Sequence, residues 1–314
     1  MPYFERGWHR SPDLIDTNPG TIMKSTRAFG VEIECQYDDE YDIEILSEDS
    51  KVNKNIGIGS DGSINGQGVE IRTPPASGKA GENMIRGLCS VLKERCFDVD
   101  NSCGLHVHID ASDMKDKVRE EEEGYKIAKN YWLFYIVMDD VIRSFLPPSR
   151  RRNDYCKPCE SVYRAVHDAK SLMDLMLIYE SSDSTLLDAN SRVKYKDPTR
   201  YRGINLISLW REWHAEIRYH NGTLQGERIL HWAYLHCLIM DKIMDGTITL
   251  AWIESMRATK GLSVKSKALY AILGMNKPTE IYLKARQIKF STIISKLLST
   301  EVIENLQLLQ DNSN

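Results

Sequence analysis

Four short segments of this chain alternate strictly between apolar and polar residues. They cover residues 29–35, 68–73, 104–110 and 215–219. Period-two alternation places apolar side chains on one face of a β-strand and polar side chains on the other. Apolar strand faces need cover, which helices commonly supply. The pattern therefore predicts an α+β fold with helices on one face of a sheet and a polar face opposite.

Helical periodicity appears between and after these segments. One apolar stripe runs over Ile85, Leu88, Val91, Leu92 and Cys96, and a second over Ala128, Tyr131, Tyr135, Met138 and Ile142. The second helix should end before the proline pair at 147–148. Another helix is expected at 169–179, and the chain beyond residue 226 is mostly helical in pattern. We expect an N-terminal arm (1–26), a main domain (27–250) and a helical C-terminal extension (251–314).

Composition narrows the class of protein. The 314 residues hold 41 basic and 45 acidic side chains, a formal charge of −4, which does not favour a general nucleic-acid binder. No apolar run of membrane-spanning length and no signal-peptide core is visible. Seven cysteines, an odd number in a long chain, do not indicate a disulfide framework. We expect a cytoplasmic protein with reduced thiols and no membrane or nucleic-acid partner.

The polar faces of the four segments are rich in metal ligands and phosphate-binding groups. They carry Glu32, Glu34, Glu70, Arg72, His106, His108, Glu216, Arg218 and His220. Positions i and i+2 lie about 7 Å apart, so Glu32 and Glu34 could serve two adjacent cations. Carboxylate-rich sites favour Mg²⁺ or Mn²⁺, and arginines bind phosphate in a bidentate way. The set indicates phosphoryl transfer from a nucleotide. A catalytic zinc held by both strand histidines and one glutamate is the alternative.

Five segments resemble, in order, the successive blocks of the putative amidoligase family. They are FGVEIEC (29–35), SDGS with EIRTPP (60–63 and 70–75), CGLHVHID (103–110), YRGINL (201–206) and EIRYHNGTL (216–224). The resemblance runs over about two-thirds of the chain, and segment 150–156 is similar to the family's basic loop. It implies a curved antiparallel sheet of glutamine-synthetase type and a relationship to glutamate–cysteine ligases.

The resemblance also implies an activity. An ATP- and Mg²⁺-dependent ligase would join a carboxylate to an amine through an acyl phosphate, with an amino acid, peptide or protein side chain as substrates. The metal ligands would be Glu32, Glu34, Glu70, His108 and Glu216. The groups that contact the nucleotide would be Arg72, His106, Asn205 and Arg218.

Three residues are expected to act in catalysis. Arg202 and Arg218 would stabilise the transferred phosphoryl group. Asp61 would orient or deprotonate the amine. For Asp61 and Asn205, a hydrogen bond within a turn or at a strand end is an equally good interpretation.

Other functions fit part of the pattern. They are a phosphotransferase of guanidino-kinase type, a non-enzymatic nucleotide- or metal-binding regulator, and a zinc hydrolase. The basic run 150–152 could reach a nucleotide phosphate or an acidic substrate. Cys156 and Cys159 have zinc-knuckle spacing but lack a second pair, so we interpret them as incidental thiols.

Overall fold

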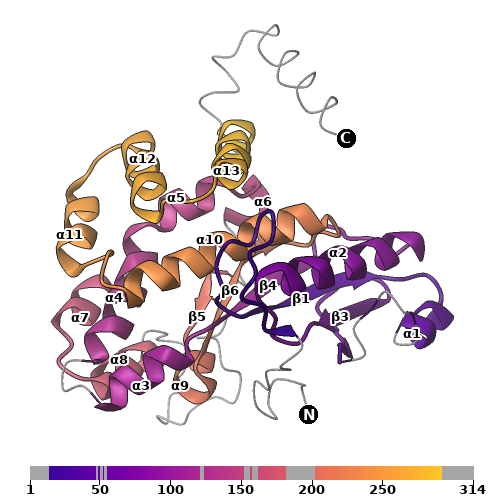
Figure 1. Ribbon diagram of the computed structural model, residues 1–314, viewed down its shortest axis with the longest axis horizontal. Coiled ribbons are helices and arrows are strands. Elements are labelled where there is room, and N and C mark those ends of the chain that lie inside the picture. The colour runs from indigo at the N-terminus through magenta and orange to yellow at the C-terminus, as the bar shows by residue number, and fades with distance from the viewer. Residues whose placement is uncertain are drawn as a thin grey trace, which may run out of the picture.

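The computed structural model describes residues 14–46, 49, 52, 55–120, 124–151, 156–157, 162–181 and 202–291. Its centre is a six-stranded sheet in which every neighbouring pair of strands is antiparallel (Figure 1). The strand order is β2-β3-β1-β4-β6-β5. The bounds are β1 Phe29–Gln36, β2 Gly57–Ser60, β3 Gly68–Arg72, β4 Gly104–Asp110, β5 Ile204–Asn205 and β6 His214–Asn221. This confirms the predicted antiparallel sheet with helices; its glutamine-synthetase type stays a prediction.

The four alternating segments are the four inner strands of this sheet. Its two edge strands were not predicted. β2 and β5 are four and two residues long, too short to show a periodicity. Both edge strands nevertheless extend the polar face, because each pairs with a strand that carries site residues.

The apolar faces of the strands form the core together with two long helices. Val31, Ile33, Leu105 and Val107 are fully buried on this side. The covering helices are α2 (Gly78–Glu94) and α10 (Gly226–Met244), which contact each other, and α10 also contacts β4 (Figure 1). Gly81 lets α2 approach closely, since a Cβ there would lie 2.8 Å from the Phe29 ring. The polar face is thus the face opposite this core.

Two helical expectations need correction. The predicted helix through residues 128–142 is two helices, α4 (Tyr125–Val137) and α5 (Asp139–Ser144), separated at Met138. Cys96 lies beyond the end of α2, is exposed and has a φ of 56°, so it does not belong to the buried stripe. A helical period alone does not reveal such a local interruption. The other helices before α10 are α1 Glu40–Leu46, α3 Ser112–Glu120, α6 Pro148–Arg151, α7 Tyr163–Asp168, α8 Leu172–Ser181 and α9 Ile207–Glu212.

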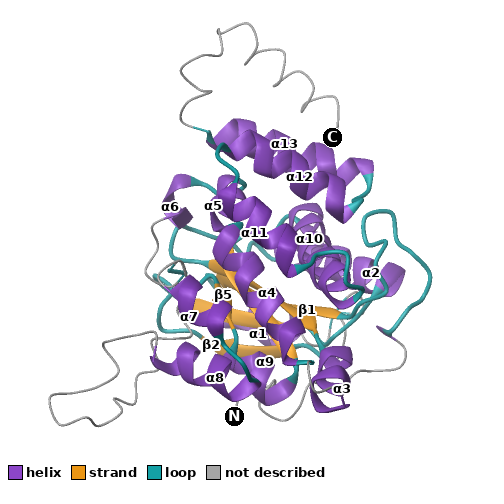
Figure 2. Cartoon of the chain, turned by 90° about the vertical axis from the view of Figure 1, so that its left-hand side faces the viewer, coloured by secondary structure: helices purple, strands orange, loops and turns teal. Residues whose placement is uncertain are grey.

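The described part of the C-terminal region, up to residue 291, is helical, as predicted. It contains α11 (Leu250–Ala258), α12 (Leu262–Leu273) and α13 (Lys277–Phe290). Helices α12 and α13 pack against α5 and α10, above one end of the sheet (Figures 1 and 2). No described helix is both long and apolar enough to cross a membrane.

The described part of the N-terminal arm, residues 14–26, is packed against the helices. Met23 is fully buried. The backbone N–H groups of Ile22 and Met23 donate to the Glu82 carboxylate of α2, at 3.0 and 3.3 Å. Ser25 donates to Asp241 of α10 at 2.7 Å. These contacts make this segment a covering layer of the main domain.

Candidate active site

The strand register brings the predicted polar residues into adjacent rows. The directly opposed pairs are Glu34–Glu70, Glu32–Arg72, Glu32–His106, His108–Glu216 and Asn205–Glu216. Opposed residues of an antiparallel pair share one face of the sheet. The four glutamates, both strand arginines and two of the three histidines therefore share one buried polar face.

The third histidine, His220, does not lie on this face. A β-bulge shifts the β4–β6 register, so that His220 pairs with Leu105 of the apolar face. Its ring is fully buried 5.1 Å from the ring of Trp232 in α10. The prediction for His220 was wrong because a bulge inserts one residue and reverses the alternation beyond it.

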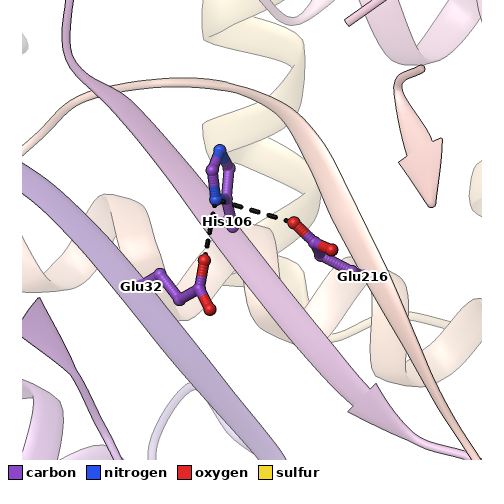
Figure 3. A group of neighbouring side chains, drawn as sticks. All are labelled: Glu32, His106 and Glu216. Carbon is purple, nitrogen blue, oxygen red and sulfur yellow. Dashed lines mark hydrogen bonds and ion pairs between the residues drawn. The ribbon is translucent and has the colours of Figure 1, made fainter. Parts of the chain in front are cut away.

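His106 is the centre of the carboxylate cluster (Figure 3). Its Nδ1 lies 2.9 Å from Glu32 Oε2 and 3.7 Å from Glu216 Oε1. Its Nε2 lies 3.4 Å from Glu34 Oε1. Two groups of potential metal ligands therefore share this ring. One consists of Glu32, His106 and Glu216, and the other of Glu34, Glu70 and His106. Within each group the ligand atoms lie within 4.8 Å of one another.

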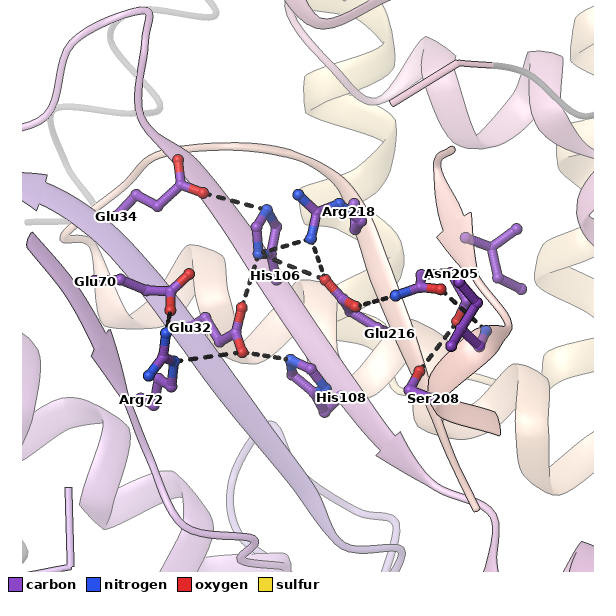
Figure 4. A network of polar contacts seen from close by, with 12 residues as sticks. Glu32, Glu34, Glu70, Arg72, His106, His108, Asn205, Ser208, Glu216 and Arg218 are labelled. Carbon is purple, nitrogen blue, oxygen red and sulfur yellow. Dashed lines mark hydrogen bonds and ion pairs between the residues drawn. The ribbon is translucent and has the colours of Figure 1, made fainter. Parts of the chain in front are cut away.

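Hydrogen bonds and ion pairs orient the four carboxylates (Figure 4). Arg72 pairs with Glu70, and Arg218 pairs with Glu216. Asn205 Nδ2 donates to Glu216 Oε2 at 2.6 Å, while its Oδ1 accepts from the backbone of α9 at 3.0 Å. Asn205 thus makes both the strand-end hydrogen bond and a contact with a site carboxylate.

The carboxylates differ in their electrostatic environment. Burial and the negative charge of Glu32 raise the pKa of Glu70 to about 8, although Arg72 opposes this rise. Burial alone would also raise the pKa of Glu216, but Arg218 and His108 lower it to about 2. A cation bound beside Glu70 would relieve this crowding, because a cation stabilises ionised carboxylates.

These residues fit a hard divalent cation. Each group offers two carboxylates and one imidazole, and Mg²⁺ or Mn²⁺ prefers oxygen ligands with water or phosphate completing the shell. Neither group contains His108. Among the described residues, no set of three potential ligands within 4.8 Å of one another includes both His106 and His108. The geometry thus favours the oxygen-rich interpretation over the zinc site that uses both strand histidines.

His214 is a site residue that the sequence analysis missed. It is buried at the start of β6, with Nδ1 3.1 Å from Nδ1 of His108 and Nε2 3.3 Å from Glu212. His108 Nε2 in turn lies 3.2 Å from Glu32 Oε1. The alternation of β6 extends back to residue 214, a signal that could have found it. In this arrangement His108 supports Glu32, and its predicted role as a metal ligand stays a prediction.

Two predicted catalytic residues lie near the edges of the sheet. Asp61 follows β2 and uses Oδ1 in a turn, accepting from the Ser63 backbone at 2.8 Å and from its hydroxyl at 2.7 Å. Arg202 is buried and forms a parallel bridge with Lys157, two residues before β5. Their catalytic roles stay predictions. Cys156 is buried with Sγ 3.2 Å from the Arg150 carbonyl, and Cys159 lies outside the described residues.

Replacing Glu70 by glutamine is expected to stabilise the metal-free protein at alkaline pH. The raised pKa means that wild-type stability falls as pH rises from 4.5 to about 8, because ionised Glu70 is disfavoured in the fold. The variant keeps a neutral side chain. Its Tm in EDTA should exceed that of wild type by roughly 5 °C at pH 9 and equal it at pH 5. Parallel Tm–pH curves for the two proteins would contradict this electrostatic account.

The sequence was compared with curated proteins and with models of protein families. A search of curated proteins found no match. A family model described as "Putative amidoligase enzyme" matches residues 25–240 of the 314. This range contains the whole polar face and more than half of the chain. The chain therefore belongs to the putative amidoligase family.

Proposed function

We propose that the chain is an ATP- and Mg²⁺-dependent ligase that activates a carboxylate as an acyl phosphate and joins it to an amine. The observation that supports this most strongly is the pair of ligand groups that share His106 on one buried face. Adjacent cations can bridge the oxygens of a transferring phosphoryl group. Membership of an amidoligase family supports formation of an amide bond.

The two groups would hold two cations side by side. Glu32 and Glu216 would hold one, Glu34 and Glu70 the other, with the His106 ring between them. Bound Mg²⁺ would neutralise phosphate charge and keep coordination positions open for phosphate oxygens. The site's own residues orient these ligands: Arg218 and Asn205 fix Glu216, and Arg72 fixes Glu70.

The proposed chemistry has two displacements. A substrate carboxylate oxygen attacks the γ-phosphorus of ATP, and the bond to ADP breaks. The amine nitrogen then attacks the acyl carbon, phosphate leaves, and the amine loses a proton, for which Asp61 is the proposed acceptor. Arg218 and Arg202 would stabilise negative charge on the phosphoryl group, where preorganised cations have their largest effect.

Product analysis tests the proposal. We expect the full chain with ATP, Mg²⁺ and a panel of amino acids and peptides to form ADP, phosphate and an amide in equal amounts, detected by mass spectrometry. EDTA should stop the reaction. A phosphorylated substrate without any amide would contradict the ligase proposal and favour a phosphotransferase. Activity that needs zinc and no ATP would replace it by a hydrolase.

A further inference from the structure

Arg150 brings a third guanidinium to the polar face. It belongs to α6, which packs against β6, and only 4% of the residue is exposed. Its Nη2 donates to the carbonyl of Arg218 at 3.0 Å, and its Nε to the carbonyl of Tyr219 at 3.4 Å. These acceptors belong to the bulge of β6, so the bulge that displaces His220 also fixes this side chain.

Arg150 differs from the other two arginines of this face in its charge pairing. Arg72 and Arg218 each form an ion pair with a glutamate. No described carboxylate lies within 4.0 Å of the Arg150 side-chain nitrogens. A buried charge that has no counter-charge in direct contact is unfavourable. Burial lowers the pKa of this guanidinium, although the nearby Cys156 and Glu34 oppose this change. An anionic ligand would supply a counter-charge in direct contact with Arg150.

Three polar groups of the site converge over Gly104. A Cβ on Gly104 would lie 3.1 Å from Glu34 Oε2, 3.3 Å from His106 Nε2 and 3.3 Å from Arg150 Nη2. Even one added carbon would be crowded there, so the absence of a side chain at Gly104 lets the guanidinium lie directly beside two proposed metal ligands. A guanidinium has five N–H donors, and the two carbonyl contacts leave donors on Nη1 and Nη2 for a ligand.

We propose that Arg150 binds a phosphoryl group of the nucleotide beside the cation that Glu34, Glu70 and His106 would hold. This inference rests on the proposed function. The sequence analysis left open whether the basic run 150–152 reaches a nucleotide phosphate or an acidic substrate, and the inference selects Arg150 and the phosphate. Arg72 and Arg218 are already engaged with carboxylates, whereas the charge of Arg150 is available to an incoming anion. The planar guanidinium can bind two phosphate oxygens at once.

The test is calorimetry of the full chain with two probes. One is a non-hydrolysable ATP analogue with Mg²⁺, and the other is inorganic pyrophosphate with Mg²⁺. Arg150→Lys keeps the charge but loses the two-bond contact, so its affinity for both probes should fall about 10- to 100-fold. Affinity for Mg²⁺ alone should change less than about twofold, since Arg150 is not a ligand. Arg150→Gln, which can still donate to the bulge carbonyls, serves if the lysine variant does not fold.

Arg151→Lys is the matched control. The Arg151 side chain donates to the carbonyls of Leu146 at 3.1 Å and Phe290 at 2.5 Å. It should bind both probes as wild type does. Equal affinity in the Arg150 variants and wild type would overturn the inference but leave the ligase proposal intact. Equal losses in the Arg150 and Arg151 variants would also overturn it, since they would indicate a structural effect. Pyrophosphate binding that depends on Arg150, without nucleotide binding, would support the anion site and contradict the ATP-dependent ligase.

Discussion

Replacing Glu34 by glutamine is expected to lower ligase turnover by at least about 10³-fold, because a lost metal ligand removes several kcal/mol of charge stabilisation. Glu34 belongs to one of the two ligand groups and accepts from the Gly104 backbone N–H at 2.5 Å. Glutamine keeps the shape of the side chain, so the fold should be retained. Calorimetry should show weaker Mg²⁺ binding in the same variant.

Glu216→Gln should lose activity to a similar extent, with a different effect on stability. Arg218 and His108 hold the pKa of Glu216 at about 2, so the ionised carboxylate stabilises the fold at neutral pH. Its removal leaves Arg218 without its carboxylate partner, and the Tm should fall at pH 7. Glu227→Gln, at an ion pair with Arg86 outside the site, is the control for glutamate loss. Wild-type Mg²⁺ affinity in both site variants would exclude these residues as metal ligands.

Arg218→Lys is expected to lower turnover at least about 10²-fold, because an ammonium cannot reproduce a planar, preorganised guanidinium. Arg218 pairs with Glu216, and its Nη1 lies 3.5 Å from Nδ1 of His106. Lysine retains the charge, so stability should change little. Steady-state kinetics with Mg²⁺-ATP is the measurement.

Arg86→Lys provides the comparison for this arginine. Arg86 also pairs with glutamates, Glu82 and Glu227, but it lies outside the site, and its side chain is 42% exposed. Its variant should keep wild-type turnover. Near-normal turnover in Arg218→Lys would show that Arg218 has no part in the chemical step. Loss of turnover together with loss of Mg²⁺ affinity would show that it acts by holding Glu216.

The inner strands and the faces of most of their residues could be predicted from the sequence. Strict alternation leaves one choice of face for Glu32, His106 and Glu216 once one side is buried. The glutamates, histidines and arginines on these polar faces then indicated the binding of cations and phosphate, without any knowledge of distances. The order of the strands and the pairing of Glu34 with Glu70 required the structure, because alternation contains no information on which strands are neighbours.

The failures have local physical causes. His220 was placed on the wrong face because the bulge in β6 has no composition signal. The central position of His106 depends on side-chain distances that a spacing pattern does not specify. Arg150 was noticed as part of a basic run, but its burial against the bulge carbonyls depends on the packing of α6 on β6.

Trapping of the intermediate with hydroxylamine tests the proposed mechanism most directly. Hydroxylamine attacks an acyl phosphate at its carbonyl carbon, releases phosphate and leaves a hydroxamate. We expect hydroxamate to form in an amount equal to ADP, and only with enzyme, ATP, Mg²⁺ and the carboxylate substrate all present. Glu34→Gln should form neither product. AMP and pyrophosphate in place of ADP, or ADP without any hydroxamate across the whole substrate panel, would contradict the acyl-phosphate mechanism.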